Sequence, residues 1–403
     1  MNEILENKER KFSKLRIKFT LAELGGSLGD WGTLIPFIIG YVSIVGLNPA
    51  GIFLCIGLTN IILGIKYNLP LPVEPQKTIG TIAISQKWSP NLVISTGFGT
   101  GIVWLILGFT KKLNVIVEKI PQIAVRGVQL GLGLILGWAA LLLFSDNIIL
   151  GLISMAIIIV LINNKKIPSA IVLTIIGIFI IFYTGALLLT QISLGLPAFE
   201  FQIPTWENIL IGMLIAGIAQ LVLTLANVMI ATVKLSKDLF PDKKDAIDAN
   251  SLALNMGLIN IISPFLGGIP QCHGSGGLAA QYAFGARTGG SMIMEGILEI
   301  FLGLFCSNLL FLIFMEFPKA ILGAMLLYTA ILLGKIAFKD FSVKTAPIII
   351  ISGILCFIFN LVVGFLAGLV LYLIFKKKIK EQPQIVKESE PGPEELQLKT
   401  KEN

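Results

Sequence analysis

The sequence LPLPVEPQKTIG, residues 69–80, interrupts the hydrophobic pattern of the chain, and GGIPQCHGSGGL, residues 267–278, interrupts it in the same way. Prolines remove backbone donors and push the preceding residue out of the helical region, so each stretch begins as extended chain. After Pro75 the chain can turn helical, and after Pro270 a polar, glycine-rich helix start follows. Each stretch is therefore expected to form a short extended piece followed by a half-helix.

The rest of the chain is strongly apolar. Of its 403 residues 55% are hydrophobic and 14% are charged, whereas a soluble domain carries about 25% charged residues. Apolar blocks such as 148–162 and 346–359 predict transmembrane helices. A span with its connection takes about 25 residues. The length of the expected membrane domain, residues 19–375, therefore predicts about 14 spans. Residues 1–18 and 376–403 are expected to be a cytoplasmic segment and a flexible cytoplasmic tail.

The basic residues gather in alternate connections, which the positive-inside rule assigns to the cytoplasm. The predicted inner connections contain Lys111 and Lys112; Lys165 and Lys166; Lys234, Lys237, Lys243 and Lys244; and Lys335, Lys339 and Lys344. Lys87 and Lys319 are exceptions. This pattern predicts a multi-pass protein of the cell membrane with both termini inside, and topology rather than a nucleic-acid partner explains the net charge of +7.

Paired interruptions in corresponding positions of two halves are typical of transporters built from inverted repeats. Two half-helices that begin near the membrane midplane would direct their free N–H groups at one site, and helix N-termini attract anions. The sequence therefore favours an anionic substrate. The alternative is that both breaks are structural kinks.

Three motifs resemble the molybdate transporter family, which is related to the sulfate permeases: ELGGSLGDWGT (23–33), PLPVEPQK (70–77) and PQCHGSGGL (270–278). The resemblance implies an all-α fold of seven-plus-seven inverted repeats, shared with uracil permease, in which the third and tenth spans are broken. Spans 1–4 and 8–11 would form a core domain, and spans 5–7 and 12–14 a gate domain. It also implies a homodimer and, in the molybdate branch, no C-terminal regulatory domain.

The chain departs from the family motif at two positions: Glu74 stands where the family has Gln, and Gln76 where it has Met. A carboxylate beside an oxyanion site is repulsive unless it is protonated or paired with Lys77. Glu74 and Asp30, a carboxylate inside an apolar span, are therefore the candidates for proton or cation coupling. Asp30 can instead pair with Lys77 or fix the first span against the third.

Eight residues are the candidates for substrate binding. They are Thr33, Gln76, Lys77, Gln220, Asn227, His273, Gly274 and Ser275. Lys77 either attracts the oxyanion or ties the core together through Glu74 or Asp30, because a lone intramembrane cation is costly. Small residues such as Gly274 let an anion approach the backbone. His273, the only histidine in the chain, either couples protonation to substrate or is structural.

Polar residues on two further helices form one-face patterns. Gln220, Thr224 and Asn227 lie at i, i+4 and i+7, so they share one face of the eighth span and line a cavity or bond a neighbouring helix. Glu295 and Glu299 form a similar pair on the eleventh span, as an anchor within the core or a proton route.

The sequence thus predicts a secondary active transporter of a tetrahedral oxyanion, molybdate by resemblance, working by alternating access, with proton symport as the candidate coupling. The alternatives are a sulfate or general anion transporter, or a channel, of the same fold. No ATP-binding loop, metal-ligand spacing or nucleophile with its base is recognisable, so neither a cofactor nor a metal nor an enzyme is expected.

Overall fold

The computed structural model describes residues 16–111, 113, 121–162, 164, 168–187, 195–197, 201–243 and 246–376. Most of the two predicted terminal segments, residues 1–15 and 377–403, lies outside the described residues. The same holds for Lys112, Lys165, Lys166 and Lys244 of the predicted inner connections.

The first half of the chain contains eight described α-helices and one strand. They are α2 (Leu21–Ser27), α3 (Trp31–Gly40) with the π-helical turn η1 (Tyr41–Val45), α4 (Pro49–Tyr67), β1 (Val73–Pro75), α5 (Lys77–Gln86), α6 (Pro90–Thr110), α8 (Gln122–Phe144), α9 (Ile148–Leu161) and α10 (Ser169–Tyr183).

The second half follows the same order. It contains α11 (Trp206–Gly212), η4 (Met213–Gly217), α12 (Ile218–Thr224), η5 (Leu225–Thr232), α13 (Val233–Leu239), α14 (Ala249–Ile262) with η7 (Ser263–Leu266), β2 (Gln271–His273), α15 (Ser275–Ala283), α16 (Gly290–Phe305), α17 (Ser307–Met315), α18 (Lys319–Ala337), α19 (Ala346–Ile358) and α20 (Leu361–Phe375).

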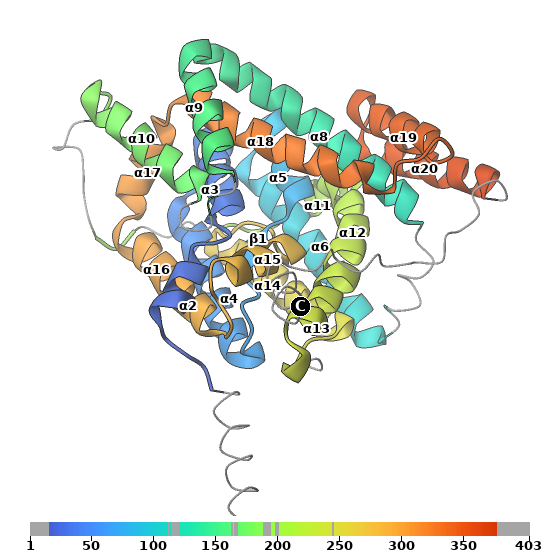
Figure 1. The fold of residues 1–403 in the computed structure, drawn as a ribbon, viewed down its shortest axis with the longest axis horizontal. Helices are drawn as coiled ribbons and strands as arrows, with labels where there is room; N and C mark the ends of the chain where they lie inside the picture. Colours follow the sequence, from blue (N-terminus) through green and yellow to red (C-terminus); the bar gives the residue numbers. More distant parts are fainter. Residues whose placement is uncertain are drawn as a thin grey trace, which may run out of the picture.

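The two breaks in the hydrophobic pattern become two short strands that pair with each other. β1 and β2 are antiparallel, with Val73 opposite His273, Glu74 opposite Cys272 and Pro75 opposite Gln271. Each strand leads into a half-helix, α5 or α15, as the proline positions predict. β1 and α15 lie in the middle of the molecule (Figure 1). The expected all-α fold is therefore confirmed, with one two-stranded sheet at its centre.

The helices of the two halves pack across one another in equivalent pairs. α4, which precedes β1, packs against α16, and α14, which precedes β2, packs against α6. α8 and α18 also pack along each other, across the top of the view in Figure 1. This exchange of partners between the halves is what two interlocked repeats produce.

Seven described helical segments are long and apolar enough to cross a membrane, or eight if the pair α16 and α17, bent by 83°, is one span. α10, α19 and α20 are shorter apolar helices. The predicted number of 14 spans is therefore not tested by helix length alone. Large apolar side chains on the outside of the molecule, such as Ile153 (53% exposed) and Val160 (80% exposed) on α9, suit a lipid-facing surface.

The contact between α4 and α16 depends on glycines. A Cβ on Gly296 would lie 2.4 Å from the backbone oxygen of Gly57, and a Cβ on Gly57 would lie 2.6 Å from that of Gly296. Such backbone contact between helices needs small residues. It fixes α4, and with it the strand that follows, against α16.

We expect Gly296→Ala to lower the midpoint of thermal unfolding in detergent, because overpacking costs about 1–3 kcal/mol. Gly334→Ala on α18 is the matched control, since nothing lies within 4 Å of its added Cβ. Equal midpoints for the two variants would contradict the tight α4–α16 contact.

Candidate functional site

The centre of the molecule is a frame made of backbone from both halves. In addition to the β1–β2 ladder, the backbone N–H of Gln76 donates to the carbonyl of Pro270 at 2.9 Å. Non-helical backbone at membrane depth survives only where protein or a water-lined cavity satisfies its polar groups. The paired strands meet that requirement and bring the starts of α5 and α15 together.

Two buried asparagines in equivalent helices hold the strands. The N–H of Val73 donates to Oδ1 of Asn60 on α4 at 3.0 Å, and the N–H of Gln271 donates to Oδ1 of Asn260 on α14 at 2.8 Å. Asn260 also donates to the carbonyl of Gln271 at 2.7 Å. Neither asparagine is among the residues predicted from the sequence. The sequence feature that could have identified them is an asparagine within the apolar helix that precedes each proline-containing interruption.

Glu74, at the middle of β1, makes two polar side-chain contacts. Its Oε2 lies 3.1 Å from Nζ of Lys77, at the first position of α5. Its Oε1 accepts a hydrogen bond from the hydroxyl of Thr33 on α3 at 2.8 Å. The side chain of Glu74 is 2% exposed and that of Lys77 31%. Of the two roles predicted for Lys77, the pairing with Glu74 is present in the structure.

The same carboxylate lies against the start of α15. A Cβ on Gly274 would lie 2.8 Å from Glu74 Oε2, and one on Gly277 would lie 3.2 Å from Glu74 Oε1. The first helical hydrogen bond of α15 runs from Leu278 N–H to the Gly274 carbonyl. The three preceding N–H groups have no partner within the helix and make its start attractive to anions.

The accessible part of this region surrounds the buried carboxylate. Gly276 is exposed, and Thr33, Lys77, Gly274 and Ser275 are half-buried. Of the predicted binding residues, these last four are the ones that meet at Glu74 or beside it. Together they offer a cation, hydroxyl groups and backbone donors.

Gln220 on α12 meets the other half-helix. Its Oε1 accepts from the backbone N–H of Thr78, in the first turn of α5, at 2.9 Å, while its Nε2 donates to Thr224 at 2.9 Å. Two members of the expected polar face, Gln220 and Thr224, therefore bond each other, and Gln220 reaches the start of α5.

Three of the predicted substrate-binding residues do not face Glu74. His273 is opposite Val73 in the ladder, so its side chain leaves the face opposite to Glu74. The amide of Gln76 donates to Thr100 and to the Gln271 carbonyl. Asn227 in η5 accepts from Gln129 of α8 at 3.3 Å.

Asp30 belongs to a second buried network, which meets the contacts around Glu74 at Thr33, because the Thr33 hydroxyl also lies 3.1 Å from the backbone carbonyl of Asp30. Gln281 on α15 donates to Asp30 Oδ1 at 3.0 Å and to Glu295 Oε2 at 2.6 Å, and Trp31 donates to Glu295 Oε1 at 3.0 Å. The alternative pairing of Asp30 with Lys77 is not formed among the described residues, where Asp30 bonds Gln281. Glu299 accepts from Asn60 at 2.9 Å. This network ties α3, α4, α15 and α16 together.

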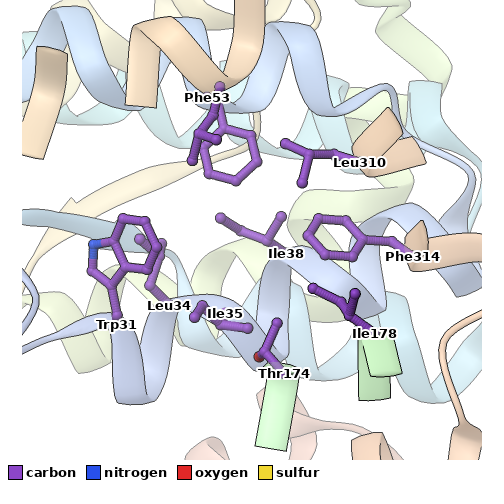
Figure 2. A pocket seen from close by; sticks show the side chains of 10 residues that line it. Trp31, Leu34, Ile35, Ile38, Phe53, Thr174, Ile178, Leu310 and Phe314 are labelled. Carbon is purple, nitrogen blue, oxygen red and sulfur yellow. The ribbon is translucent and has the colours of Figure 1, made fainter. Parts of the chain in front are cut away.

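An apolar cavity of about 90 Å³ lies apart from this site. Its lining comes from α3, α4, α10, α16 and α17, and Figure 2 shows Phe53, Ile178 and Phe314 directed into it. Thr174 brings the one hydroxyl of the lining, and no charged side chain lines it. The cavity does not suit an oxyanion. It lies where α10, from the predicted gate, meets α3 and α4, from the predicted core.

We expect Gln281→Leu to lower the thermal midpoint strongly. It removes the amide shared by two buried carboxyl groups, and an unsatisfied buried polar group costs about 1–3 kcal/mol, more when charged. Gln122→Leu, at an exposed position on α8, is the matched control. If both variants unfold at the same temperature, the network does not hold these helices together.

The sequence model of a family described as "Molybdate transporter of MFS superfamily" matches residues 22–136 and 212–333. The chain is 31% identical to Molybdate transporter 2 of Arabidopsis thaliana, over 90% of this chain and 89% of that protein.

Two solved structures have a similar fold. The transmembrane domain of the cyanobacterial bicarbonate transporter BicA superposes with a TM-score of 0.64 at 16% identity, covering 86% of this chain and 97% of that one. The murine anion transporter Slc26a9 in its inward-facing state gives 0.66 at 14% identity, over 90% and 69%. Both confirm the predicted transporter fold.

Proposed function

The chain belongs to the molybdate transporter family, a family of membrane transporters and not of enzymes, and from that premise we propose that it carries molybdate across a membrane by secondary active transport. The observation that carries the proposal is the meeting of Lys77, Thr33 and the glycine-lined start of α15 at one partly accessible place. A doubly charged tetrahedral oxyanion needs this combination of a cation and convergent donors.

The proposed site lies between the two half-helices. One anion oxygen is within reach of Lys77, and the others face the backbone N–H groups and hydroxyl of the Gly274–Gly276 segment. Gln220 of α12 lies next to this site, because its side-chain amide contacts the first turn of α5. Gln76, Asn227 and His273 remain candidates only through a rearrangement, because their side chains are bonded or directed elsewhere.

Transport requires that this site opens to each side of the membrane in turn. We assign the helices that hold the half-helices, including α3, α4, α14 and α16, to the moving core, and α8–α10 and α18–α20 to the gate. The apolar cavity between α3 and α10 supports this division, because apolar surfaces can slide without breaking hydrogen bonds. Coupling to protons through Asp30 and Glu74, a homodimer, and a cell-membrane location with both termini inside belong to the same proposal.

Uptake into proteoliposomes tests the substrate. We expect saturable molybdate uptake that survives an excess of sulfate and increases with an inward-acid pH gradient. Uptake abolished by a modest sulfate excess would make the protein a sulfate or general anion carrier. Flux that does not saturate would indicate a channel, and an unchanged rate under the gradient would remove proton coupling.

We expect Lys77→Met to weaken molybdate uptake about ten- to hundredfold in kcat/KM, because hydrogen bonds to charged groups contribute about 1.5–3 kcal/mol. Lys335→Met on α18, an exposed lysine, is the matched control, and Lys77→Arg is expected to retain part of the activity. Normal uptake by folded Lys77→Met would exclude Lys77 from the site.

A further inference from the structure

The carboxylate of Glu74 stands where the proposed function puts the transported anion, and the following inference rests on that function. Glu74 contacts Lys77 at 3.1 Å and the Thr33 hydroxyl at 2.8 Å, and its carboxylate lies against the glycines at the start of α15. These are three groups that would attract an oxyanion. Glu74 comes from the strand of one repeat and meets the half-helix of the other.

The N-termini of the two half-helices contact different kinds of side chain. The start of α5 is met by a neutral group, the amide oxygen of Gln220. The start of α15 is met by the carboxylate of Glu74, close to Gly274 and Gly277. In a frame whose strands and anchoring asparagines are equivalent, a negative charge stands at one half-helix and a neutral amide at the other.

The pair formed by Glu74 and Lys77 differs from a surface ion pair because Glu74 is buried. Its side chain is 2% exposed, whereas the Lys77 side chain is 31% exposed and Gly276 is exposed. An anion that arrives from the accessible side meets the cation and the helix start first, with Glu74 beneath them. Like charges that share one site repel each other, so both cannot hold these groups fully.

We propose that Glu74 is a tethered competitor of the transported oxyanion. Its carboxylate competes for Lys77 and for the start of α15, so binding of a divalent oxyanion requires Glu74 to give up part of these contacts. When the anion leaves, Glu74 takes them back. The competitor thus weakens binding and favours release.

Equilibrium dialysis of the purified full-length protein against molybdate tests this competition. Glu74→Gln keeps the shape of the side chain and an oxygen that can accept from Thr33, but it removes the charge. We expect it to bind molybdate about tenfold more tightly than the wild type. Glu74→Asp keeps the charge on a side chain one methylene shorter, and we expect an affinity between the two.

Glu23→Gln is the control for loss of any buried carboxylate. Glu23 is 2% exposed and accepts from Thr288 and from the N–H of Arg287, away from Lys77. We expect its molybdate affinity to stay within about twofold of the wild type. An equal gain in Glu23→Gln and Glu74→Gln would overturn direct competition.

Unchanged or weaker binding by folded Glu74→Gln, with normal binding by the wild type, would overturn the inference and leave the proposed function standing. If Glu74→Gln does not fold, unchanged affinity in Glu74→Asp overturns it equally. If neither the wild type nor any variant binds molybdate or sulfate, the proposed function fails, and the competition with it.

Discussion

The pairing of β1 with β2 joins the two halves of the chain at the centre of the fold. Each strand is extended backbone inside an apolar domain, where an unpaired N–H or carbonyl is costly. The ladder, the Gln76–Pro270 bond and the asparagines Asn60 and Asn260 satisfy these groups together. Because each strand comes from a different half of the chain, neither half can complete the frame alone.

This frame explains why the polar groups of the core form two sets, which meet at Thr33. The antiparallel register sends Glu74 and Cys272 to one face and His273 to the other. On the Glu74 face, Lys77, Thr33 and the α15 start converge. Asp30 is in the other set, with Gln281, Glu295 and Trp31, which fastens the helices around the frame. One set is partly accessible and suited to an anion, and the other is closed.

Much of this arrangement was predictable from sequence because its causes are local. Alternating prolines forbid a helix at 69–75, and the same logic applies before Pro270, so the two half-helices follow from backbone chemistry. A lysine inside the membrane domain needs a partner for its charge. Glu74, three residues before Lys77, is one of the two partners that the sequence predicts, and Asp30 is the other. The family resemblance and the transporter fold followed from the same motifs.

What could not be predicted depends on register and on distant contacts. That the two breaks pair as strands, and in which register, decides that His273 turns away from Glu74, and no local pattern encodes this. The anchoring role of Asn60 and Asn260 and the Gln281 bridge between Asp30 and Glu295 join residues from separate helices. The sequence showed these residues but not their partners.

In the proposed site the anion is held by Lys77 and the start of α15. Anomalous X-ray scattering from molybdenum in crystals grown with molybdate locates the anion directly. We expect a single strong peak within hydrogen-bonding reach of Lys77 Nζ and the backbone N–H groups of the Gly274–Gly276 segment, with the Glu74 carboxylate displaced from them. A peak elsewhere in the protein, with the Glu74–Lys77 pair unchanged, would contradict it.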